Sequence, residues 1–203
     1  MHLEFLVEEN SAEAALRNLV PKIIGAAATF DIHSHQGKRD FLAKLPRKLA
    51  AYRHWAPPDW RIVVLVDRDR DDCKALKRKL ERTAKAVDLR TKSAPGQKGI
   101  YQVLNRLAIE ELEAWFFGDA QALVTAYPRL PSRLDKKAPY RDPDAIRGGT
   151  WESLERLLQK YGYYEGGMPK IEVARQVSAQ MDPVRNRSRS FQHFRQGLVE
   201  LAG

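Results

Sequence analysis

The chain has 203 residues, which is enough for one large domain or two small ones, each with a hydrophobic core. Hydrophobic residues make up 43% and charged residues 30%, a composition that excludes wholesale disorder. The 35 basic residues outnumber the 26 acidic ones, and the net charge of +9 favours polyanionic partners. The single Cys73 excludes an internal disulfide, and no apolar run is long enough to span a bilayer. The first residues lack the basic start of a signal peptide, so we expect a cytoplasmic protein.

Short, branched apolar runs predict strands. The run RIVVLV at residues 61–66 is the strongest, because a continuous apolar sequence is typical of a strand covered on both faces. Residues 2–7 are a second clear candidate. Further strands are expected at residues 28–34 and 103–109, and a weaker one at residues 88–92.

Apolar stripes with helical spacing separate these strands. Asn10 is predicted to cap a first helix, with Glu13 completing a capping box, and Pro21 to kink or end it. Further helices are expected at residues 38–54, 74–85 and 110–117. Strands that alternate with helices of this length predict an α/β fold with a mostly parallel sheet flanked by helices.

The character of the sequence changes after Asp119. Residues 127–143 contain four prolines and show no clear period. Amphipathic helices are then expected at residues 150–161, 169–181 and 190–201. We therefore expect an α/β domain at residues 1–120 and a small C-terminal helical extension, residues 121–203, packed on it.

Two acidic groups follow predicted strands. Glu8 and Glu9 come directly after residues 2–7, and Asp67 and Asp69 form an Asp-x-Asp pair after RIVVLV. In a parallel sheet, functional groups gather at the carboxyl ends of the strands. Carboxylate oxygens suit Mg²⁺ or Mn²⁺, so these side chains are candidate metal ligands. The neighbouring Asp71 and Asp72 have an ordinary alternative role as helix caps, and Glu9 as a solvated side chain.

A third acidic group lies at residues 110–113. On a helix, Glu110 and Glu113 would share a face, and acids at a helix N-terminus are also favoured by the helix dipole. Glu113 is flanked by apolar residues and therefore needs a partner, either as a second metal ligand or in an ion pair. We expect the nearby Trp115 to lie in the core.

Basic residues cluster on the helix that follows the Asp-x-Asp pair. Its exposed face is expected to carry candidate nucleic-acid contacts beside the proposed metal site, namely Lys74, Lys77, Arg78, Lys79 and Arg82. Arg187 lies in a second basic segment, which either contacts nucleic acid or a partner, or pairs with acids of the same chain. His33, His35 and Cys73 do not have a recognisable zinc spacing, and no Walker sequence is present.

A strand-end Glu followed roughly sixty residues later by a strand-end Asp-x-Asp resembles the Toprim fold of topoisomerases, primases and OLD-type nucleases. The whole chain more closely resembles the bacterial domain-of-unknown-function family 4276, a Toprim-like group often encoded beside an ABC-type ATPase. The matching stretches are LEFLVEENSAEAALRNLVP, RIVVLVDRDRDDC, NRLAIEELEAWFFGD and NRSRSFQHF. The resemblance implies Glu8 as the general-base or metal-binding glutamate, and Asp67 and Asp69 as metal ligands. Glu9 is a departure, since Toprim proteins usually place Gly there.

The function that this resemblance implies is a nuclease or phosphodiesterase dependent on Mg²⁺ (or Mn²⁺), acting with an ABC-type, OLD-like ATPase in bacterial anti-phage defence. An alternative is a binding or signalling subunit of an ATPase complex whose metal site has degenerated, and the side chain of Glu9 motivates it. A third alternative is a stand-alone nucleotide-binding α/β protein. The sequence argues against it, because it lacks a glycine-rich fingerprint. The expected partners are nucleic acid and the ATPase, with a homodimer left open and no membrane.

Overall fold

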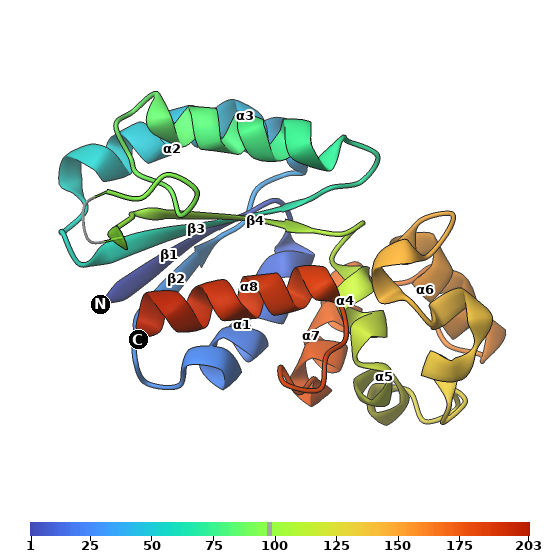
Figure 1. Cartoon of the computed structure of the whole chain (residues 1–203). Coiled ribbons are helices and arrows are strands. Elements are labelled where there is room, and N and C mark those ends of the chain that lie inside the picture. The colour runs from blue at the N-terminus through green and yellow to red at the C-terminus, as the bar shows by residue number, and fades with distance from the viewer. Residues whose placement is uncertain (97–98) are drawn as a thin grey trace.

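The described part of the computed structural model, residues 1–96 and 99–203, contains one sheet of four parallel strands (Figure 1). The strands follow the order β2-β1-β3-β4 across the sheet. Their bounds are β1 (His2–Val7), β2 (Thr29–His33), β3 (Trp60–Asp67) and β4 (Val103–Ala108). The α/β fold with a parallel sheet is therefore confirmed.

Helices cover both faces of the sheet (Figure 1). The two faces belong to separate hydrophobic clusters: Val63 and Leu65 of β3 lie in one, and Val64 and Val66 in the other. This double burial explains why the β3 sequence is apolar throughout. The helices on the first face are α1 (Asn10–Ile24) and α8 (Arg189–Ala202), and those on the second are α2 (Lys38–Trp55) and α3 (Cys73–Lys85).

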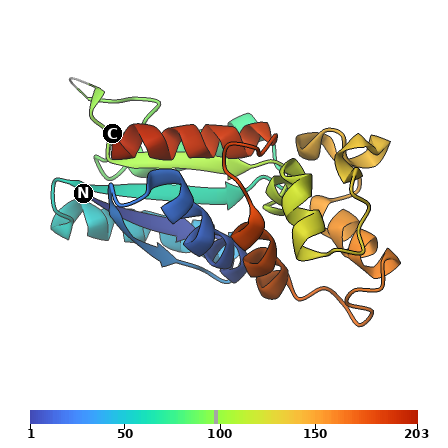
Figure 2. The same cartoon turned by 90° about the horizontal axis from the view of Figure 1, so that it is seen from below.

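The remaining helices gather at the end of the sheet where the strands finish (Figure 2). They are α4 (Glu113–Gly118), α5 (Ala120–Ala126), α6 (Thr150–Lys160) and α7 (Lys170–Gln180), and three short 3₁₀ turns lie between α5 and α6 (Leu134–Lys136, Ala138–Tyr140 and Pro143–Ala145). α7 packs along α1, where Lys22 Nζ donates hydrogen bonds of 2.7–3.0 Å to three carbonyls at the C-terminal end of α7. None of the described helices is long and apolar enough to cross a membrane.

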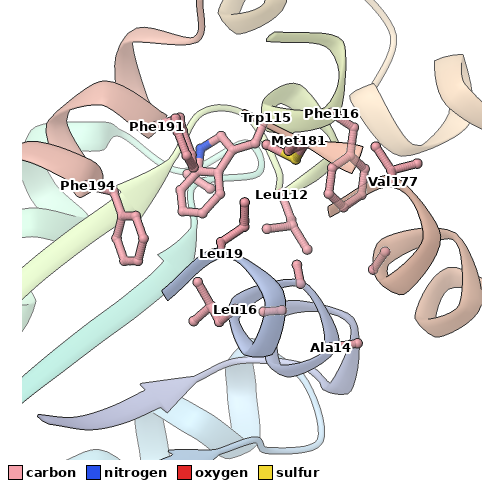
Figure 3. Close-up of a cluster of buried hydrophobic side chains, with 14 of the residues drawn as sticks. Ala14, Leu16, Leu19, Leu112, Trp115, Phe116, Val177, Met181, Phe191 and Phe194 are labelled. Carbon is pink, nitrogen blue, oxygen red and sulfur yellow. The ribbon is translucent and has the colours of Figure 1, made fainter. Parts of the chain in front are cut away.

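Trp115 joins the helical group to the sheet. Its ring lies 5.1 Å from that of Phe191 and 5.0 Å from that of Phe194, between α4, α8 and α1 (Figure 3). The indole Nε1 donates to Ser190 Oγ at 2.9 Å, so this fully buried side chain has a polar partner. Gly197 allows α8 to approach β4 closely, because a Cβ there would lie 2.9 Å from the Leu104 side chain. The prediction that Trp115 belongs to the core is confirmed.

Three local predictions were wrong. No strand forms at residues 88–92, where Thr91 makes only isolated bridges and Asp88 turns the chain with φ of +57°. Asn10 lies inside α1, and its N-cap is Glu9, which makes no side-chain capping bond. The helix expected at residues 110–117 begins only at Glu113. Residues 93–99, with Pro95 and two glycines, are predicted from the sequence to form a loop, and Gln97 and Lys98 within it lie outside the described residues.

Candidate metal site at the carboxyl edge of the sheet

The sheet order places a topological switch point between β1 and β3. The chain leaves β1 for β2 on one side and later enters β3 on the other, so the connections that follow β1 and β3 diverge. In open α/β sheets, ligands bind at this point, outside the carboxyl ends of the strands. Glu8 directly follows β1, and Asp67 is the last residue of β3.

Glu8 and Asp67 are in contact across this point. The backbone N–H of Asp67 donates to Glu8 Oε2 at 3.3 Å. Burial raises the pKa of Glu8 to about 7, the negative charge of Asp69 adds to the rise, and the nearby Lys38 opposes it. Burial also raises the pKa of Asp67 well above its ordinary range, with further contributions from the charges of Glu113 and Glu8. The site therefore holds more negative charge than its own surroundings neutralise.

Asp69 is held by backbone geometry and by a lysine. The residue adopts φ of +50°, a left-handed conformation that Asp tolerates, and its N–H donates to the Glu110 carbonyl at 2.8 Å. Lys38, the first residue of α2, places Nζ 2.7 Å from Asp69 Oδ2 and 2.8 Å from Asp71 Oδ2. Burial alone would lower the pKa of Lys38, but these hydrogen bonds raise it. Lys38 is thus a fixed positive charge at one side of the cluster.

Glu113 enters the cluster from the first turn of α4. Its side chain is buried, and burial raises its pKa to about 7, while Lys170 acts in the opposite direction. Lys170 is the first residue of α7, and its Nζ lies 3.8 Å from Glu9 Oε2 and 4.5 Å from the centre of the Trp151 ring. A lysine from the helical group therefore faces the acids of the sheet.

The other two acids of the third group have separate roles. Glu111 accepts hydrogen bonds from Thr150 Oγ1 at 2.8 Å and from the backbone of Trp151 at 2.9 Å, so it caps the start of α6. Glu110 Oε1 lies 3.7 Å from an Arg68 guanidinium nitrogen. Because α4 begins at Glu113, the prediction that Glu110 and Glu113 share one helical face was wrong.

Glu9 does not need the freedom of glycine. Its backbone is extended, with φ of −136° and ψ of 162°, a conformation open to any residue. Its side chain is directed to Lys170 and accepts a long hydrogen bond of 3.5 Å from Ser11 Oγ. The departure from Gly therefore adds a negative charge to the site, and this charge contributes to the raised pKa of both Glu8 and Glu113.

The basic residues of α3 divide into two sets. Lys77 is half-buried and donates to the Asn105 carbonyl at 2.6 Å and to Glu81 at 2.9 Å, so its predicted exposure was wrong. Lys74 and Arg78 are exposed. A groove of about 830 Å³ between α2 and α3 begins at Lys38 and Asp71 beside the acidic cluster, and its basic lining continues along Arg39, Lys79 and Arg82.

The second basic segment mainly holds the fold together. Arg185 donates two hydrogen bonds of 2.8 Å to the buried Asp119, and Arg187 lies 3.9 Å from Asp135. Asn186 donates to the Trp115 carbonyl at 2.7 Å. These contacts agree with the alternative in which the segment pairs with groups of the same chain, and they place Arg187 beside α5 rather than beside the acidic cluster.

The donor set at the carboxyl edge suits a hard divalent cation. Its candidate ligands are all carboxylates, which Mg²⁺ and Mn²⁺ prefer, and these ligands are Glu8, Asp67, Asp69 and Glu113. Lys38 and Lys170 were not anticipated as members of the site. Each simply opens a helix, and nothing in the local sequence indicates which distant acid it reaches.

The sequence matches the family described as Domain of unknown function (DUF4276) over residues 7–199. No curated protein and no solved structure matches the chain. The match includes every candidate ligand at the carboxyl edge as well as α7 and most of α8. The chain therefore belongs to this domain-of-unknown-function family.

Proposed function

We propose that this protein is a Toprim-like nuclease or phosphodiesterase that depends on Mg²⁺ or Mn²⁺. The observation that carries the proposal is the contact between the Glu8 carboxylate and the Asp67 backbone at the switch point of a parallel sheet, with further carboxylates acting on Asp67. Glu8, Asp67, Asp69 and Glu113 would hold the cation. When bound, such a cation lowers the pKa of water and neutralises charge that builds up on a phosphate.

The chain's own residues supply the other requirements of phosphodiester cleavage. Burial raises the pKa of Glu8 to about 7 in the absence of a cation, and Glu8 would act as the general base only where Asp67, Asp69 and Glu113 hold the cation, because coordination lowers the pKa of a carboxylate. Lys38 and Lys170 place positive charges on two sides of the acids, where a phosphate would need them. The basic groove that starts at Lys38 offers a path for a nucleic-acid backbone.

A cleavage assay tests this proposal. Purified protein with Mg²⁺ or Mn²⁺ is incubated with single- and double-stranded DNA, RNA and tRNA, with and without the proposed ABC-type ATPase partner. We expect cleavage that Glu8→Gln abolishes and Glu110→Gln retains, because Glu110 lies at the same edge but faces Arg68. Equal activity of the two variants, or no cleavage of any substrate, would contradict the proposal. The ATPase partner and the defence role rest on the family resemblance.

A second candidate is a binding or signalling subunit without catalysis. The observation that favours it is the ammonium group of Lys38, which donates a hydrogen bond of 2.7 Å to the Asp69 carboxylate. In this alternative, Lys38 takes the place of the metal ion. Isothermal titration with Mg²⁺ separates the two: the nuclease binds the ion and Asp67→Asn does not, whereas the degenerate subunit shows no binding in either form.

A further inference from the structure

A second group of metal-ligating side chains lies at the other end of β1. One ligand atom from each of His2, Glu4 and Asp31 lies within 4.8 Å of those of the other two. His2 Nε2 is 3.2 Å from Glu4 Oε1 and 3.6 Å from Asp31 Oδ2. The strand covers about 20 Å between His2 and Glu8 at roughly 3.3 Å per residue, so this group is separate from the carboxyl-edge site.

The pairing of β1 with the edge strand β2 brings these residues together. Glu4 pairs with Asp31 in parallel register, and His2 pairs with Thr29. Side chains two positions apart on a strand share a face, so His2 and Glu4 point the same way. The Tyr52 hydroxyl donates to Glu4 at 3.0 Å, which shows that this is the face covered by α2. The strands thus fix three ligands on a rigid support.

The ring of His2 is oriented by two neighbours. Its Nδ1 is 2.8 Å from Thr29 Oγ1, and the ring lies 4.2 Å from that of Trp60. When Nδ1–H donates to the threonine hydroxyl, the Nε2 lone pair is directed at the carboxylates of Glu4 and Asp31. That arrangement requires a cation between them, either a proton or a metal ion.

Glu4 is oriented in the same manner. Its carboxylate is buried, and Oε2 is engaged by His33 Nε2 at 2.6 Å as well as by Tyr52. The other oxygen, Oε1, is left facing His2. Hydrogen bonds that orient ligands from behind are a regular feature of metal sites. Asp31 completes the group from the solvent side, with 69% of its side chain exposed.

We propose that His2, Glu4 and Asp31 bind a divalent transition-metal ion such as Zn²⁺. One imidazole nitrogen with two carboxylates is a donor set for Zn²⁺ or Co²⁺ rather than Mg²⁺, and the two negative charges match the charge of the ion. Ligand atoms around a tetrahedral Zn²⁺ lie about 3.4 Å apart, close to the 3.2 Å and 3.6 Å that separate His2 Nε2 from the carboxylate oxygens of Glu4 and Asp31. The two carboxylate oxygens lie within 4.8 Å of each other, and the exposed Asp31 side chain can adjust this distance. Three protein ligands leave a fourth position for water.

The consequence for the protein is a link between the sheet and its edge strand. His2 and Glu4 belong to β1, and Asp31 belongs to β2, so an ion bound by all three joins the two strands. Because a ligand that binds only the folded state stabilises it, the ion should raise the melting temperature. This site is independent of the proposed nuclease activity.

Co²⁺ absorption tests the site, because low-coordinate Co²⁺ with a histidine ligand gives stronger visible bands than Co²⁺ in an all-oxygen site. The titration uses the full chain carrying Cys73→Ser, so that the exposed thiol adds no charge-transfer band. We expect visible bands that saturate near one equivalent, that Zn²⁺ displaces, and that Asp67→Asn retains. A rise in melting temperature with Zn²⁺ should accompany them.

Matched variants make the assignment specific. Asp31→Asn removes an exposed ligand with little risk to folding, and His2→Gln removes the nitrogen ligand. Both should lose the bands and the Zn²⁺-dependent rise in melting temperature, whereas His54→Gln, on the exposed end of α2, should keep both. Absence of the bands in the parent protein, or bands that persist in Asp31→Asn and His2→Gln, would overturn the proposal and leave the cluster as a network of hydrogen bonds and ion pairs.

Discussion

Asp119 and Glu113 are two buried acids only six positions apart, and their surroundings are opposite. Asp119 accepts four hydrogen bonds: from the backbones of Ala122 and Asp182, and twice from the Arg185 guanidinium. Glu113 is surrounded by other acids, and its strongest opposing charge is Lys170. Burial with enough donors stabilises an ionised carboxylate, whereas burial among like charges does not.

The same contrast separates the carboxyl edge of the sheet from the N-terminal end of α8. At this helix end, Asp144 accepts hydrogen bonds from the Ser188 hydroxyl at 2.6 Å and from the backbone N–H of Arg189 at 2.6 Å. At the carboxyl edge, Glu8 accepts one long backbone hydrogen bond and faces Asp69. From this difference we infer that a buried carboxylate is a candidate functional group when it has too few hydrogen-bond donors and positive charges around it to stabilise its ionised form.

The largest expected effect is a pH dependence that a cation reverses. Glu8 and Glu113 each have a pKa near 7 in the folded state, above the ordinary 4.5. The folded state therefore binds these protons more tightly than the unfolded state, so the stability that these two groups contribute is fully present below about pH 4.5 and is lost as the pH rises through about 7. One such group accounts for roughly 3 kcal/mol. Urea unfolding in EDTA at about pH 5 and about pH 8 measures this loss, and Mn²⁺ should restore stability at about pH 8.

Glu113→Gln is the control for this effect. The amide cannot ionise, so the variant should lose less stability between the two pH values than the parent protein, and Asp135→Asn, a paired acid away from the edge, should behave like the parent. If the free energy of unfolding in EDTA rises between these two pH values instead, the proposed difference between the acids of the carboxyl edge and the well-bonded acids elsewhere is contradicted.

The second effect concerns the satisfied acid. Asp119→Ala removes the bidentate ion pair with Arg185. It also removes the N-cap of α5, in which the Asp119 side chain accepts a hydrogen bond from the backbone N–H of Ala122. We expect a loss of about 2 kcal/mol or more in the free energy of unfolding, from the charge-assisted hydrogen bonds and the lost cap. The loss should be the same with and without Mn²⁺. A Mn²⁺-dependent loss would show that Asp119 belongs with the acids of the site.

Part of this contrast was predictable from the sequence. The strand at residues 61–66 and the acids that follow it are local features, since a run of branched apolar residues specifies a doubly covered strand. The predicted strand at residues 88–92 failed because its parallel pairing with β4 is confined to one bridge, between Thr91 and Val103, and the chain turns at Asp88. Local propensity does not report which segments find a strand partner.

The cations of the site were not predictable for a related reason. Lys38 and Lys170 are two of 35 basic residues, and only the packing of α2 and α7 decides which acids they meet. In the same way, Asp31 and Glu4 are brought together by the register of β1 and β2, which no motif records. Pairing over long sequence distances is a property of the fold, whereas a strand or a helix is a property of a short segment.

The third effect is on metal affinity. Lys38→Met removes the ammonium group that occupies Asp69 and Asp71. We expect Mn²⁺ to bind severalfold more tightly, on the order of 1 kcal/mol, because the ion no longer competes with a fixed positive charge. Isothermal titration measures the change, with Lys44→Met on the exposed face of α2 as the control. Weaker Mn²⁺ binding in Lys38→Met would show that the lysine supports the ion rather than replacing it.

The smallest effect extends the contrast to the basic residues of α3. Lys77 has partners in Glu81 and the Asn105 carbonyl, whereas Lys79 is exposed and lines the groove that starts at the site. Lys79→Gln should therefore weaken nucleic-acid binding severalfold on every sequence and lower the slope of log affinity against log salt by about 1, since one phosphate contact is lost. Lys77→Gln should leave the salt slope nearly unchanged and instead reduce stability, because Glu81 and the Asn105 carbonyl lose the ammonium group that they bind.

Fluorescence anisotropy across a salt series measures both variants, with Lys160→Gln on α6 as a control for net charge. An equal slope change in all three variants would mean that the protein responds only to its total charge, and the groove between α2 and α3 would then have no special role in binding.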